Sequence, residues 1–336
     1  MKRIFGLIIS VSLLLTLFVG CNNSSNTGIM SNTTSTTEAS IDIIEQENPS
    51  TEFHYEETDS GEIIILGYIG TDPTVVIPHA IVGKPVTAIE MAAFRSLDFL
   101  ESVKMPNSIK KIGSQAFAHC SNLQTVIFSN TLEIISSDAF YECHLLSDVV
   151  LPNTLKHIGY RAFSNCLSLK HITIPGDCFN IDSGEAFYGS GLETISFQEG
   201  VSMIPSSAFY MTKIKEIELP NTVRKIDTAA FMGCELEKIQ LNKGLEEIAM
   251  LAFGQNPFTE ITIPETVKSI SEYAFVKCEN FTALKFLGDA PVSFLCDSNL
   301  LIERFSKDSP NYTIFYLESA TGFTSPEWNG YPTALW

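Results

Sequence analysis

The dipeptide Ala-Phe recurs along the chain at an almost constant spacing. Successive phenylalanines of these pairs are 22, 23 or 24 residues apart, and nine such pairs occur. Composition alone does not produce such a period, so the spacing predicts an array of stacked structural repeats. The phenylalanines that mark the repeat are Phe94, Phe117, Phe140, Phe163, Phe187, Phe209, Phe231, Phe253 and Phe275.

Other apolar residues recur at fixed distances from the marker phenylalanine. An isoleucine stands five residues before the phenylalanine in eight of the nine units, and an apolar pattern such as Leu169/Ile172/Ile174 follows the phenylalanine. Alternation with a period of two is typical of a half-buried strand, and a proline such as Pro175 ends it. Each unit is therefore predicted to hold a short strand, a turn, a second extended segment and a tight Ala-Phe turn. Neighbouring units must cover one another's apolar sides.

The segment from Leu146 to Cys166 shows the unit in its fullest form, Leu-x-x-Val-x-Leu-Pro-x-x-Leu-x-x-Ile-Gly-x-x-Ala-Phe-x-x-Cys. This unit resembles the BspA-like type of leucine-rich repeat, which occurs in bacterial surface lipoproteins. The resemblance implies a β-rich solenoid, a leucine-rich-repeat array of about nine 22–24-residue units with short strands and tight turns, capped at both ends. It also implies a cell-surface protein with an adhesive or recognition role.

The chain begins with a predicted signal peptide over residues 1–20. A positively charged start precedes an apolar stretch that is short for a membrane span, and small residues follow. Residues 21–50 are dense in Ser, Thr and Asn and have little to bury, so they are predicted to form a disordered tether.

The residues from Leu17 to Cys21 resemble a bacterial lipobox. The resemblance implies that Cys21 becomes the mature N-terminus, carries acyl chains and anchors the protein to the outside of a bacterial envelope. Phe18 departs from the leucine that is usual at its position. Secretion without a lipid is the alternative.

The repeats are predicted to fill residues 86–287, with a cap on either side. Residues 51–85 read as a strand-rich N-terminal cap, and residues 288–336 as an aromatic C-terminal cap that holds Trp328 and Trp336. An open solenoid end exposes strand edges that must be covered. We expect the tryptophans to pack inside the cap, and a carbohydrate-binding platform is the alternative.

Five cysteines stand three residues after a marker phenylalanine: Cys120, Cys143, Cys166, Cys234 and Cys278. Leu97, Ser190, Thr212 and Asn256 hold the same slot in other units, so in most units it holds a small residue able to hydrogen-bond. The slot therefore favours a small buried side chain that bonds to the turn backbone, and the cysteines are predicted to be free thiols. Disulfides between adjacent units and a metal site are the alternatives. One thiol per unit spreads metal ligands apart.

No established motif for catalysis or for phosphate, calcium or zinc binding occurs in the sequence. His119 beside Cys120 looks like a nucleophile and its base, but neighbours in sequence need not face each other. We therefore expect no catalytic residue, no metal and no cofactor, and the chain is predicted not to be an enzyme.

The formal net charge of −18 restricts the partners. Such an acidic surface repels phosphate backbones and anionic lipid headgroups. We expect no nucleic-acid binding, contact with a membrane only through a lipid on Cys21, and a soluble monomeric body.

The outward strand positions favour a binding surface. Ile127 and Val150 occupy the same position in neighbouring units and stand among polar residues. Such a patch can mark a partner site, although β-branched residues also suit an exposed strand. We predict that a protein or glycan macromolecule at the cell surface binds this sheet face. The alternatives are a structural or spacer envelope protein without a dedicated partner, and an accessory that binds or hydrolyses carbohydrate. The predicted contact residues are Thr125, Ile127, Asp148, Val150, His171 and Thr173.

Overall fold

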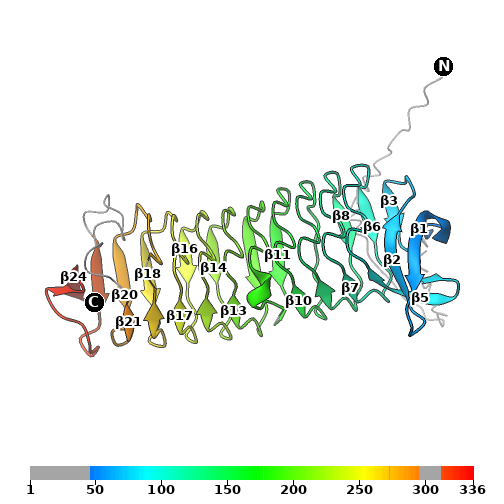
Figure 1. Cartoon of the computed structure of the whole chain (residues 1–336). Coiled ribbons are helices and arrows are strands. Elements are labelled where there is room, and N and C mark those ends of the chain that lie inside the picture. Colours follow the sequence, from blue (N-terminus) through cyan, green and yellow to red (C-terminus); the bar gives the residue numbers. More distant parts are fainter. Residues whose placement is uncertain (1–45, 177, 272, 295–311) are drawn as a thin grey trace, which may run out of the picture. The chain divides into compact units, whose positions relative to one another are not determined.

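The computed structural model describes residues 46–176, 178–271, 273–294 and 312–336. The predicted signal peptide, Cys21 and residues 21–45 of the predicted tether lie outside the described residues. The described part forms a β-solenoid of about 11 turns with almost no helix, which confirms the predicted fold class (Figure 1). The predicted count of about nine repeat units stays a prediction. No helix among the described residues is long and apolar enough to cross a membrane.

One face of the solenoid, here called the strand face, is made of parallel strands from the leucine-rich positions of successive units. In the three-residue strands the central apolar residue is turned inward and its neighbours outward, as Val126 shows between Thr125 and Ile127. The strands are β3 (Thr74–Val76), β6 (Ser102–Lys104), β8 (Thr125–Ile127), β11 (His171–Ile174), β12 (Thr194–Phe197), β14 (Glu216–Glu218), β16 (Lys238–Gln240), β18 (Glu260–Ile263), β20 (Ala283–Phe286), β22 (Thr313–Tyr316) and β24 (Tyr331–Leu335).

A second row of parallel strands holds the isoleucine that precedes the Ala-Phe turn in eight of the nine units. Most of these strands are only two residues long, and the isoleucine is their buried member, as Ile135 and Ile158 show. The strands are β2 (Ile63–Tyr68), β5 (Lys84–Ile89), β7 (Lys111–Ile112), β9 (Ile134–Ile135), β10 (His157–Ile158), β13 (Met203–Ile204), β15 (Lys225–Ile226), β17 (Glu247–Ile248), β19 (Ser269–Ile270) and β21 (Ser293–Phe294).

The end segments continue these two rows. In the N-terminal segment β2 pairs in parallel with β5, and in the C-terminal segment β22 pairs in parallel with β20. Three antiparallel strands are added: β1 (Phe53–Glu57) on β2, β4 (Ala80–Ile81) on β5, and β23 (Glu327–Trp328) on β24. Two 3₁₀ turns complete the elements, η1 (Ser50–Glu52) and η2 (Ile181–Ser183). The predicted boundaries at residues 85 and 287 stay predictions.

The nine marker phenylalanines form one continuous column of stacked rings. Neighbouring ring centroids are 4.8 Å apart for Phe94 and Phe117 and 6.0 Å apart for Phe253 and Phe275, and all nine side chains are fully buried. The separations lie close to or slightly above the strand spacing of about 4.8 Å, so each unit lies in register on the next. The column is the spine that the Ala-Phe period predicts.

The Ala-Phe turns are joined by a third ladder of backbone hydrogen bonds. The N–H groups of Asp138, Phe140 and Glu142 donate to carbonyls of the next turn at 2.8, 2.8 and 3.0 Å. Asp138 and Glu142 have φ angles of 57° and 58°, a left-handed conformation that is unfavourable for residues other than glycine. The same conformation recurs on both sides of the other markers, so bonds between turns offset a strain that every unit carries. We call the residues from three before to two after each marker the turn edge.

The cysteine slot is buried, and its side chains bond to the preceding turn. Cys120, Cys143 and Cys166 donate from Sγ to the carbonyl oxygens of markers one turn earlier, at 2.9, 3.0 and 3.3 Å. Asn256 makes the same contact through its amide at 2.8 Å, to Phe231. The five slot cysteines are buried free thiols that bond to the turn backbone, as the sequence predicts. Cys296 lies outside the described residues.

Replacing a marker in the middle of the column is expected to destabilise the fold strongly. Phe163→Ala would leave a cavity between two stacked rings, and such truncations lower the free energy of unfolding by about 3–5 kcal/mol. Urea unfolding followed by circular dichroism measures the change. Phe163→Leu should lose clearly less, and Gln240→Asp on the exposed strand face should change stability by at most about 0.5 kcal/mol. Equal losses for all three would contradict the role of the column.

The slot thiols are expected to resist alkylation in the folded protein. Burial raises the pKa of Cys120, Cys234 and Cys278 to about 12, so almost no thiolate is present at neutral pH. Mass spectrometry after iodoacetamide treatment should find the five slot cysteines unmodified in native protein and modified after unfolding in urea. Rapid labelling of the native protein would show that the slot is open.

Candidate partner-binding face

The predicted contact residues lie on the outer side of the strand face. Ile127 is 47 % exposed and Val150 82 % exposed, which is unusual for large apolar side chains. Thr125 is half-buried, and Asp148 is exposed. A single parallel bridge joins Thr125 to Asp148, and this register places Val150 on the turn beside Ile127.

The ladder of the strand face is interrupted directly after this bridge. Strands β3, β6 and β8 form one sheet and β11 and β12 form another, and among the described residues no strand pairing joins residues 148–151 to β11. Backbone groups on the two sides of the break lack ladder partners, and the two turns leave space between them. Val150 stands on one rim of this break and β11 forms the other.

A hollow of about 390 Å³ occupies the break. Its wall includes three of the six predicted residues, Val150, His171 and Thr173, whereas Thr125, Ile127 and Asp148 lie on the neighbouring turns outside it. The structure therefore divides the predicted set into a half that lines the hollow and a half that extends the surface beside it.

Four further polar residues of the wall escaped the sequence prediction: Asn153, Thr194, Ser196 and Gln198. Nδ1 of His171 hydrogen-bonds to the hydroxyl of Thr194, and the Gln198 amide donates to Oδ1 of Asn153 at 3.1 Å. These bonds join side chains of different turns, so the rim is held in place. Thr194 and Ser196 occupy the repeat positions of His171 and Thr173 in the next unit. This equivalence in the sequence could have predicted that they belong to the same surface.

Close backbone contact positions β12 at the hollow. The N–H of Gly191 donates to the carbonyl of Cys166 at 3.0 Å, and a Cβ on Gly191 would collide with the carbonyl oxygen of Leu167. Only glycine allows this approach, which places Thr194 and Ser196 two turns from Val150.

A second hollow, of about 360 Å³, lies on the other side of β12. It includes Ser196, Phe197 and Asn221, together with the carboxylates Glu199 and Glu218. Ser196 borders both hollows, so the ribbon of β11 and β12 stands between two depressions. The first has neutral hydroxyl and amide groups, and the second is acidic.

Beyond the second hollow the strand face carries pairs of opposite charge. The ammonium group of Lys238 lies 2.7 Å from Glu216, and that of Lys285 lies 2.8 Å from Glu260. The hydrogen bond to Glu216 raises the pKa of Lys238. These cross-strand pairs give this half of the face the character of a solvated surface.

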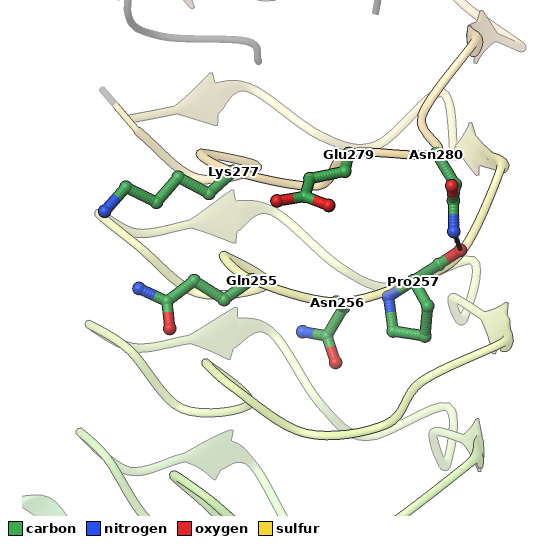
Figure 2. A pocket seen from close by; sticks show the side chains of 6 residues that line it. All are labelled: Gln255, Asn256, Pro257, Lys277, Glu279 and Asn280. Carbon is green, nitrogen blue, oxygen red and sulfur yellow. Dashed lines mark hydrogen bonds between the residues drawn. The ribbon is translucent and has the colours of Figure 1, made fainter. Parts of the chain in front are cut away.

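A third hollow, of about 450 Å³, lies where two turns bend toward the strand face (Figure 2). Its wall is polar, with Gln255, Lys277 and Glu279, and the Asn280 amide donates to the carbonyl of Pro257 at 3.2 Å. Asn256 is also in the wall, and its amide group donates hydrogen bonds to backbone carbonyls of its own turn and of the preceding turn. This hollow offers no nucleophile paired with a base.

The side chains of the neighbouring residues His119 and Cys120 point away from each other. Nδ1 of His119 lies 3.1 Å from a carboxylate oxygen of Glu142, whereas the thiol of Cys120 is buried against Phe94. The two side chains do not form a nucleophile and base. Among the described residues, no three His, Cys, Asp or Glu side chains are placed to hold a metal ion.

Trp328 is buried, as the packing interpretation predicts. Its ring packs against Phe294 and Phe323 with centroids 4.8 Å apart in both cases. Trp336 is half exposed, so the expected packing inside the cap is wrong for this residue, whose ring lies 5.5 Å from the ammonium group of Lys285.

Comparison with known structures agrees with the solenoid. A leucine-rich repeat protein from Bacteroides ovatus is 23 % identical, with 79 % of this chain and 70 % of that chain covered and a TM-score of 0.65. The leucine rich repeat protein of T. pallidum is 25 % identical over 70 % of this chain and 91 % of that chain, with a TM-score of 0.49. A leucine rich cell surface protein from Faecalibacterium prausnitzii is 19 % identical over 86 % and 98 %, with a TM-score of 0.46. The first likeness supports the fold alone.

A search of curated proteins yields no match. The family described as BspA type leucine rich repeat region matches in six copies, over residues 87–212 and 202–291. The solenoid of this family is typically non-enzymatic. These matches span more than half of the chain and contain the fullest unit, Leu146 to Cys166. The chain therefore belongs to the BspA type leucine-rich-repeat family.

Proposed function

We propose that this protein is exported, anchored by a lipid on Cys21, and binds a protein or glycan partner at the cell surface through its strand face. The proposal rests most directly on the break in the ladder beside Val150. Among the described residues the strand face is interrupted at three places, and the one beside Val150 exposes 82 % of a valine at its edge, which a protein that only spans distance does not need.

The chemistry of the hollow favours binding over catalysis. Its hydroxyl, amide and imidazole groups can donate and accept hydrogen bonds, and Val150 with Val149 and Leu151 supplies apolar area. The hollow is open and shallow, and its described wall has no carboxylate to act as a base beside His171. A rigid repeat surface of this kind binds through many modest contacts with little ordering cost.

Negative charge at Ile127 and Val150, here called the apolar rim, is expected to weaken binding strongly. In Ile127→Asp/Val150→Asp two carboxylates join Asp148, so a partner that covers the rim would bury unpaired charge and lose about tenfold or more in affinity. Binding to an array of extracellular-matrix proteins and glycans measures the change. The control Gln240→Asp/Thr262→Asp adds the same charge at the equivalent strand position in other turns.

The two double variants distinguish binding at the apolar rim from binding elsewhere on the strand face. Both should keep the circular dichroism spectrum of the parent, since none of the four side chains is buried. The proposal is wrong if Ile127→Asp/Val150→Asp binds the same targets as the parent with unchanged affinity. A parent protein that binds nothing on the array would favour the spacer alternative.

The anchor is tested separately from the strand face. We expect the mature protein purified from membranes to begin at Cys21 with a mass that includes acyl chains, and Cys21→Ser to release it to the medium. Mass spectrometry of the N-terminal peptide measures the mature N-terminus and its acyl mass, and immunoblotting of cell and medium fractions measures release of Cys21→Ser. A mature chain that begins after Cys21, or that keeps residues 1–20, would contradict lipid anchoring.

A further inference from the structure

Four tyrosines gather on the turn edge of four successive turns. They stand three residues before or one residue after a marker phenylalanine. Elsewhere in the array these positions hold no aromatic residue, for example Ser114, Ala118, Met232 and Met250. The Ala-Phe turn thus folds without an aromatic ring on its edge. The tyrosines are Tyr141, Tyr160, Tyr188 and Tyr210.

Neighbouring turns hold these side chains in fixed positions. The guanidinium of Arg161 lies between two of the rings, 5.0 Å from the centroid of Tyr141 and 4.9 Å from that of Tyr160. Its Nε forms an ion pair with Asp138 at 2.9 Å. Tyr188 and Tyr210 meet edge to face with centroids 5.2 Å apart. We call the four tyrosines and Arg161 the tyrosine cluster.

The tyrosine cluster has the composition of a protein-binding hot spot. Tyr160 is 39 % exposed and the adjoining Met211 is 49 % exposed, while the other three tyrosines are half-buried. Tyrosine, arginine and methionine are enriched in the cores of protein interfaces. A tyrosine that neighbours already hold loses little conformational entropy when a partner covers it.

Carboxylates surround the rings and define the charge of the partner. A hydrogen bond to Glu142 raises the pKa of Tyr141, and burial together with Glu185 raises that of Tyr160. Glu142 also contacts His119, and Arg161 is already paired with Asp138. Aromatic faces beside carboxylates attract ammonium and guanidinium groups. A second copy of this chain, with its charge of −18, would be repelled.

We propose that the tyrosine cluster is a docking surface for a protein segment that presents lysine and arginine side chains. Those side chains lie across the tyrosine rings and reach Glu142 and Glu185. The turn edge and the strand face occupy different positions of each unit, so this proposal is independent of binding at the hollow beside Val150.

Panning a phage-displayed library of random dodecapeptides against the full chain tests the proposal. We expect the selected peptides to be rich in Lys and Arg. A synthetic copy of one should lose about tenfold or more in affinity for Tyr160→Ser/Tyr188→Ser/Tyr210→Ser. Serine occupies these repeat positions in other turns, so the triple variant should fold, and its net charge is unchanged. Attraction that depended on charge alone would therefore survive the substitution.

Met250→Ser is the matched control, because Met250 is 43 % exposed at the repeat position of Tyr160 in a turn outside the tyrosine cluster. It should bind the peptide as the parent does. Selected peptides without an excess of Lys and Arg over the starting library would overturn the proposal. So would an affinity that is unchanged in the triple variant, or one that falls equally in Met250→Ser.

Discussion

The register between successive turns is the constraint on which the rest of the structure depends. Each Ala-Phe turn donates backbone hydrogen bonds to the next, and each marker ring stacks on its neighbours. These contacts repeat for every unit and join only adjacent units, so the stability of the array is close to a sum of unit and interface contributions. Once the register is fixed, the outward positions are free to vary.

This separation explains which features could be predicted from the sequence. The column of rings and the alternation of Val126 with its exposed neighbours follow from a period of 22–24 residues, because stacking puts equivalent residues side by side. The slot of Cys143 was predictable for the same reason, since serine, threonine and asparagine replace cysteine there. The family resemblance in Leu146 to Cys166 rests on the same positions, so it identifies the scaffold and says little about the partner.

The hollow beside Val150 was only partly predictable. Its position depends on where strand pairing fails, and pairing is decided by small displacements of backbone that residue types do not encode. The nearest signal is the 24-residue spacing between Phe163 and Phe187, which contains β11 and the turn η2. His171 and Thr173 were found because they flank the apolar pair, whereas Ser196 was passed over because the equivalent residues of its neighbouring units, Thr173 and Glu218, are polar. Its importance comes from bordering two hollows.

Departures from the repeat gather in one stretch of the chain. Residues 138–221 contain two of the three interruptions of the described strand face, the long unit, the walls of the two hollows beside β12 and the tyrosine cluster. On later turns Lys238 pairs with Glu216 and Lys285 with Glu260, and these pairs solvate the strand face. Exposed charge pairs contribute at most about 1 kcal/mol, so they are retained for solubility more than for stability. Exposed valine and clustered tyrosine do not improve solubility, and the Ala-Phe turn folds without them. Both features therefore agree with the two proposed binding surfaces, which lie on the same few turns of the scaffold.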